Sequence, residues 1–108
     1  MSGNMEQNLW GRYPTRTVKS GELQGSVSAL QGPNVECYLV NFKAVSSNAG
    51  KVYIGGSGVT IVDGTTDTTS GWELGAGEST GWIPCGNLNQ FYRICDNTGD
   101  DLTYLAIL

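Results

Sequence analysis

The fold is decided by the stretch KVYIGGSGVTIVDGTTDTTSGWELGAGESTGWIPCGNLNQFYRICDNTGDDLTYLAIL, residues 51–108. Short apolar runs alternate there with turn-forming residues, at 52–54, 59–62, 82–83, 91–95 and 102–108. Short strands at this spacing are typical of a β-sandwich or a small barrel. No window places apolar residues at i, i+3, i+4 and i+7, so we expect no helix in this stretch.

Residues 35–45, VECYLVNFKAV, predict the strongest strand of the chain. Tyr38, Val40 and Phe42 share one face, and the opposite face is also largely apolar. A strand of a sandwich has only one inner face, so one of the two sets requires a partner. We therefore assign Tyr38, Val40 and Phe42 to an oligomer interface. Residues 22–31 predict a weaker first strand, and residues 90–108 predict a hairpin that turns at 96–101.

Residues 1–21 differ from the rest of the chain. Glycine and proline interrupt every periodic pattern there, yet large apolar side chains recur in a polar stretch, unlike in an ordinary disordered tail. We predict an extended arm that docks on another protein; the alternative is that Trp10 and Tyr13 fold back onto their own domain. The candidate docking residues are Leu9, Trp10, Arg12, Tyr13, Arg16, Val18 and Lys19.

The whole pattern predicts an all-β protein: a small antiparallel β-sandwich, jelly-roll-like, over residues 22–108, preceded by the arm. The arm carries three basic residues and one acidic residue, a net charge of +2. Residues 22–108 carry three basic and nine acidic residues, a net charge of −6. An acidic body argues against nucleic acid as a partner. The basic arm suits an acidic protein surface; the alternative is that its charges only keep the segment solvated. No apolar run is long enough to cross a membrane.

Three segments carry a resemblance: YIGGSGVT (53–60), ELGAGES (73–79) and NLNQFYRICDNTGDDLTYLAIL (87–108). They resemble a pattern common in small virion proteins of tailed bacteriophages, in particular capsid decoration or cement proteins. The resemblance covers roughly the last half of the chain. It implies a homotrimer that binds the major capsid protein on the outside of the assembled capsid and stabilises it. It also implies synthesis in the host cytoplasm and no cofactor.

The cysteines are Cys37, Cys85 and Cys95. An odd count, after a start that lacks the apolar core of a secretory signal, predicts reduced and buried thiols in a reducing compartment. A bridge between Cys85 and Cys95 is the alternative, because the two flank one short unit.

The sequence offers little for catalysis. It contains no histidine, no C-x-x-C pair and no G-x-S-x-G elbow, so we expect no enzyme. Two aspartate groups, Asp63 with Asp67 and Asp96 with Asp100 and Asp101, have oxygen ligands that suit calcium. Their spacing differs from that of an EF-hand, and aspartates in turns commonly bond to backbone N–H groups instead, so we expect no metal site.

Two hypotheses compete with the assignment as a decoration protein. One is another virion part, a tail or fibre component. The other is a carbohydrate-binding module that uses Trp72 or Trp82 as a stacking platform, whereas we expect these tryptophans to fill the core or an interface.

Overall fold

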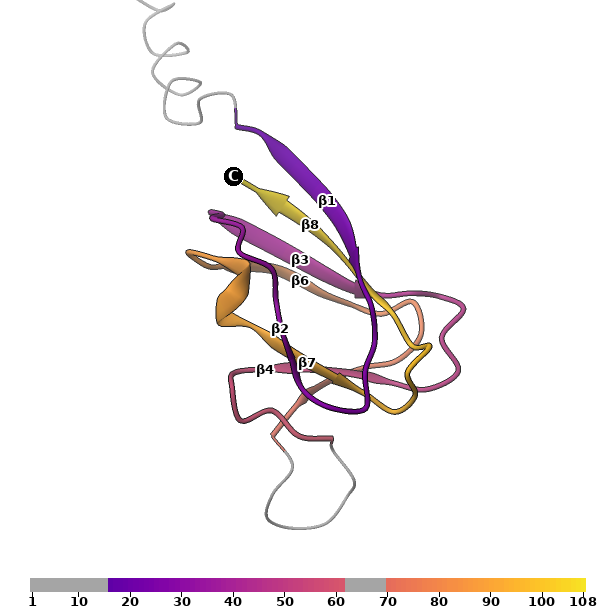
Figure 1. Ribbon diagram of the computed structural model, residues 1–108. Coiled ribbons are helices and arrows are strands. Elements are labelled where there is room, and N and C mark those ends of the chain that lie inside the picture. Colours follow the sequence, from indigo (N-terminus) through magenta and orange to yellow (C-terminus); the bar gives the residue numbers. More distant parts are fainter. Residues whose placement is uncertain (1–15, 62–69) are drawn as a thin grey trace, which may run out of the picture.

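The computed structural model describes residues 16–61 and 70–108, which form eight strands and a single 3-10 turn (Figure 1). The turn η1 (Leu88–Gln90) lies between β6 and β7. The strands are β1 (Val18–Leu23), β2 (Leu30–Gln31), β3 (Leu39–Ala44), β4 (Val52–Gly55), β5 (Trp72–Leu74), β6 (Ser79–Pro84), β7 (Tyr92–Cys95) and β8 (Leu102–Ile107).

The topology is that of a long antiparallel ribbon that has been rolled up. β1 pairs with β8, β2 with β7, β3 with β6 and β4 with β5, so the first half of the chain pairs with the second half in reverse order. Two more pairings, β3 with β8 and β4 with β7, close the ribbon into two four-stranded sheets, ordered β1-β8-β3-β6 and β2-β7-β4-β5. This is the strand order of a jelly roll, which confirms the predicted all-β sandwich.

The core lies between the two sheets. β3 and β8 contribute alternate side chains from the first sheet, and Val52 and Ile54 of β4 face them from the second. The ring of Phe42 meets the ring of Phe91 edge to face, with centroids 5.0 Å apart. The members from β3 and β8 are Val40, Phe42, Ala44, Leu102, Tyr104 and Ala106.

This core corrects the predicted oligomer interface. Val40 and Phe42 are 0% and 1% exposed inside their own subunit, so neither reaches a partner. Of the three residues assigned to that interface, Tyr38 alone is exposed, at 52%. The inward face of β3 is apolar because it forms the core, whereas its outward positions include the polar residues Asn41 and Lys43.

Several predicted boundaries are also wrong. Strand β1 begins at Val18, so the sandwich includes the last residues assigned to the arm. Residues 22–31 contain the end of β1 and all of β2, which lie in different sheets. Residues 59–61 are not a strand; residue 62 lies outside the described residues. Most importantly, β7 and β8 do not form a hairpin, because residues 96–101 carry the chain from one sheet to the other.

The crossings between the sheets meet around Asp100, which is 2% exposed. Its carboxylate accepts hydrogen bonds from the backbone N–H of Ala49 at 2.9 Å and of Gly50 at 3.1 Å, in the β3–β4 crossing. It also accepts bonds from the backbone and side-chain amides of Asn97, in its own crossing. Burial by itself raises the pKa of Asp100, but these hydrogen bonds outweigh it and leave the pKa below its usual range.

We expect Asp100→Asn to lower the free energy of unfolding at neutral pH by about 1–3 kcal/mol, because the amide presents N–H groups to backbone donors. The lowered pKa in the folded state means that the carboxylate stabilises the fold fully above its ordinary pKa of about 3.9. That contribution is lost as the pH falls through the folded value. Denaturant unfolding of both proteins, from neutral pH to about pH 2, measures the difference.

The control for Asp100→Asn is Glu36→Gln, which neutralises an exposed carboxylate. It should leave the free energy of unfolding nearly unchanged across the same pH range. Equal effects of the two substitutions would contradict a structural role for the Asp100 carboxylate.

Candidate functional site

The most unusual surface is the outer face of the β1-β8-β3-β6 sheet, which is turned away from the second sheet. Residues directly opposite one another in antiparallel strands share a face, so the pairing defines three rows across the four strands. We call these rows together the outer face. They are Val18–Ile107–Leu39–Pro84, Ser20–Leu105–Asn41–Trp82 and Glu22–Thr103–Lys43–Ser79.

The first row and half of the second are apolar. Val18 is 59% exposed, Trp82 49% and Leu105 40%, and they lie with half-buried Leu39 and Ile107 on one continuous surface. The outer face of a sandwich normally alternates polar residues with the inward apolar ones. The apolar end of the outer face is therefore the candidate interaction surface of the described residues.

The other end of the outer face is polar and hollowed. A groove of about 500 Å³ is lined there by residues that include Ser20, Asn41, Lys43 and Thr103. The side-chain oxygen of Asn41 is buried without a hydrogen-bond partner in the described part of the chain. Such a group costs stability, about 1–3 kcal/mol, in the isolated domain.

The residues predicted for the arm are distributed over three environments. Val18 is on the apolar part of the outer face, whereas Lys19, opposite Ala106, belongs to the other side of β1. The Arg16 guanidinium lies 4.2 Å from the centre of the Tyr38 ring and donates to the backbone oxygen of Leu108 at 3.4 Å. The remaining predicted docking residues, Leu9, Trp10, Arg12 and Tyr13, lie outside the described residues.

A second hollow, of about 420 Å³, opens at the side of the sandwich between edge strands β5 and β6. We call it the seam groove; its described lining is Ile54, Gly55, Gly56, Trp72, Thr80, Ile83, Gln90 and Phe91. Trp72 lies directly opposite Ile54, so it is on the inner side of β5, yet it is 68% exposed. Trp72 and Trp82 therefore do not fill the core of their own subunit, and their predicted alternative place, in an interface, stays a prediction.

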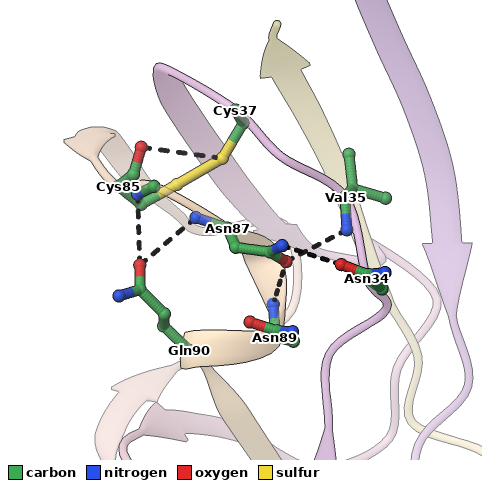
Figure 2. The surroundings of a disulfide bond; sticks show 8 residues. Asn34, Val35, Cys37, Cys85, Asn87, Asn89 and Gln90 are labelled. Atoms are coloured by element: carbon green, nitrogen blue, oxygen red, sulfur yellow. Dashed lines mark hydrogen bonds between the residues drawn. A yellow bond between two sulfur atoms is a disulfide. The ribbon is translucent and has the colours of Figure 1, made fainter.

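The cysteines differ from the prediction as well. Cys37 and Cys85 form a disulfide, with their Cα atoms 6.3 Å apart (Figure 2). Cys95 is a free thiol and is buried, as predicted. The bridge joins the residues just outside the paired ends of β3 and β6, where Leu39 faces Pro84. Proximity of Cys37 and Cys85 arises from strand pairing across 48 residues, which the spacing of the cysteines does not reveal.

A hydrogen-bond network continues from the disulfide into η1 (Figure 2). Asn87 caps the turn: its side-chain oxygen accepts from the backbone N–H of Asn89 at 2.9 Å and of Val35 at 3.0 Å. The side-chain oxygen of Gln90 accepts in return from the backbone N–H of Gly86 at 3.1 Å and of Asn87 at 3.2 Å. This capping box holds Gln90 in one orientation.

Two of the possible calcium ligands, Asp96 and Asp101, accept hydrogen bonds from backbone N–H groups. Asp101 accepts from the N–H of Gly25 at 2.9 Å, and Asp96 accepts from the N–H of Lys51 at 2.9 Å and from the Tyr53 hydroxyl at 3.1 Å. Burial, followed by the hydrogen bond to Asp96, raises the pKa of Tyr53 to about 12. No group of three metal-binding side chains occurs within residues 16–61 and 70–108. Asp63 and Asp67 lie outside these ranges.

No protein-family model, curated protein or solved structure matches this chain. Within the described ranges, no helix has the length and apolar character needed to span a membrane.

We expect alkylation of the denatured protein without reductant to label Cys95 alone, and labelling after reduction to reach all the cysteines. Because the disulfide closes a loop of 48 residues, Cys37→Ala with Cys85→Ala should lower the free energy of unfolding by about 2–4 kcal/mol. Mass spectrometry and denaturant unfolding measure the two effects. The protein is exposed to air before the assay, and labelling of Cys37 and Cys85 in that unreduced sample would contradict the bridge.

Proposed function

We propose that this chain is a structural virion protein, a decoration or cement protein that binds the outer surface of a tailed-bacteriophage capsid and stabilises it. The observation that carries the proposal is the apolar part of the outer face, centred on Val18, Leu105 and Trp82. A small domain with an already closed core gains little by exposing these side chains unless another surface covers them. The expected partner is the major capsid protein.

The start of β1 supports the same docking direction. Val18 is part of the apolar surface and also the first residue of β1, so β1 begins at the apolar part of the outer face. An arm attached at the edge of a docking surface can bind the same partner and so enlarge the contact with it. Residues 1–21 carry Arg12, Arg16 and Lys19 against a single acidic residue, and this positive charge favours an acidic partner.

Two further features fit a virion protein. Jelly rolls occur in viral capsid and lectin domains, although a fold by itself does not fix a function. Disulfides persist in oxidising surroundings, which include virion surfaces. We propose that the chain is made with free thiols in the host cytoplasm. After release, molecular oxygen takes up the two electrons and two protons that Cys37 and Cys85 lose as they form the disulfide.

The oligomeric state belongs to the same proposal. The resemblance implies a homotrimer at local three-fold positions of the capsid, and exposed Tyr38 remains available to such contacts. A tail or fibre component would use the same apolar surface on a different virion protein, so the experiments below include tails as well as capsids.

The docking surface is tested by Val18→Asp combined with Leu105→Asp. Charged side chains on a buried apolar contact are costly, so binding to capsids should weaken at least about 100-fold. The measurement is co-sedimentation with capsids assembled from the major capsid protein of the same genome, compared with purified tails. If the wild-type protein sediments with tails but not with capsids, the capsid proposal is wrong and the chain is a tail component.

A matched control exists within the chain. Val27 is 56% exposed and Leu30 39%, close to Val18 and Leu105 in type and exposure, but both lie away from the outer face. Val27→Asp with Leu30→Asp should therefore leave capsid binding within about twofold of wild type. Equal loss in the two double variants would contradict the outer face as the docking surface.

The arm is tested by deleting residues 1–15, which leaves β1 intact. We expect the truncated protein to keep its thermal unfolding midpoint and its oligomeric state, and to bind capsids at least about tenfold more weakly. Trp10→Ala in the full chain should account for much of that loss, because tryptophan offers the largest apolar surface of the segment. Unchanged binding by the truncated protein would show that the segment makes no contact.

A further inference from the structure

The seam groove has the features of a ligand site that capsid docking leaves unused. It opens between β5 and β6, and β6 is the edge of the first sheet farthest from β1. Its volume of about 420 Å³ falls in the usual range for small-ligand sites. Its base is apolar, with half-buried Ile83 and Phe91.

One wall is an aromatic surface that the fold leaves open. Trp72 lies on the inner side of a three-residue edge strand. Among the described residues no further strand covers it, and 68% of it remains exposed. Nearby, Gly55 and Gly56 present backbone without side chains, and a Cβ added at Gly56 would meet no atom within 4 Å. The exposed indole therefore offers a surface on which the apolar face of a ligand ring can stack.

The side-chain amide of Gln90 lines the seam groove in a fixed orientation. The Gln90 side-chain oxygen is held by the N–H groups of Gly86 and Asn87, and Figure 2 shows its amide nitrogen turned away from that network. This nitrogen carries two N–H donors, and neither is bonded to a described residue. Because the capping box fixes the oxygen, the donors are positioned before any ligand arrives.

The lining also limits the ligand class. None of the described lining residues is charged, which disfavours nucleotides, phosphates and acidic sugars. Addition of a peptide strand requires a regular edge, but β5 has only three residues. The pairing of β6 shifts register near Gly81, where φ is +78°, and such a bulge blocks strand addition.

We propose that the seam groove binds a neutral carbohydrate, with a pyranose ring stacked on Trp72 and a ring hydroxyl accepting a hydrogen bond from the Gln90 amide. A pyranose presents an apolar C–H face and a rim of hydroxyl groups, which match an exposed indole beside a fixed donor. On a capsid docked through its outer face, this site would give the particle an affinity for glycan-coated surfaces.

The test is an array of neutral and acidic oligosaccharides probed with the full-length protein, followed by calorimetry on the soluble form of the strongest neutral ligand. Trp72→Ala should lower the affinity about tenfold or more. Gln90→Glu keeps the oxygen that accepts from Gly86 and Asn87 but removes the donors, so it should lower affinity about fivefold. Thermal unfolding of each variant should match the wild type.

Trp82→Ala is the matched control, since it removes another exposed tryptophan from the outer face and should leave glycan affinity unchanged. Loss of binding in Trp82→Ala but not in Trp72→Ala would overturn the proposal and move the site to the outer face. Absence of binding to every neutral glycan, or a preference for acidic glycans, would also overturn it. Trp72→Ala should co-sediment with capsids as the wild type does. The glycan proposal can therefore be wrong while the capsid-docking proposal is confirmed.

Discussion

The buried carboxylate of Asp100 is the contact on which the arrangement of the two sheets most depends. Its backbone hydrogen bonds join the β3–β4 crossing to the β7–β8 crossing. The β1–β2 crossing reaches the same point: a Cβ on Gly25 would lie 1.8 Å from the Asp100 carbonyl oxygen, so only glycine fits there. A jelly roll needs its chain to change sheets repeatedly, and here neighbouring aspartates satisfy the backbone donors that those changes leave unpaired.

The opposite end of the first sheet is fixed by a different kind of bond. The disulfide joins Cys37 and Cys85 beside the Leu39–Pro84 pair, which belongs to the apolar row of the outer face. Edge strand β6 is therefore held to β3 covalently at one end. At the other end, the N–H of Gly77 donates to the carbonyl oxygen of Ala44 at 3.0 Å. A surface held at both ends has less conformational freedom to lose on docking, which favours binding.

The sequence was sufficient for the fold class because the apolar runs and their turn residues are local signals. The runs at 52–54 and 102–108 coincide closely with β4 and β8. The partner of each strand was not predictable, because β1 pairs with β8 across almost the whole chain and nothing local encodes that register. For the same reason, residues 90–108 resembled a hairpin, although Asp100 turns the chain into the other sheet.

The same distinction applies to the candidate sites: some residues can be recognised from their own segment, and others only from the pairing of distant strands. Val18 was singled out from the composition of its segment, and it lies on the apolar surface. Leu105 was not singled out, because an apolar residue between Tyr104 and Ala106 does not reveal on its own which side is outside. The Cys37–Cys85 bridge depends on the pairing of β3 with β6, so an odd cysteine count was misleading.

The outer face and the seam groove both arise because each sheet has only four strands and therefore two edges. β6 ends the first sheet and β5 ends the second, so no strand of the described residues closes the side of the sandwich between them. Trp72 faces inward at that open side and remains exposed for this reason, whereas Trp82 is exposed because it faces outward from β6. Two tryptophans ten residues apart in sequence therefore belong to different surfaces. A partner that covers the outer face contacts Trp82 and leaves the seam beside Trp72 open, so a single small domain has room to dock and to bind a ligand at once.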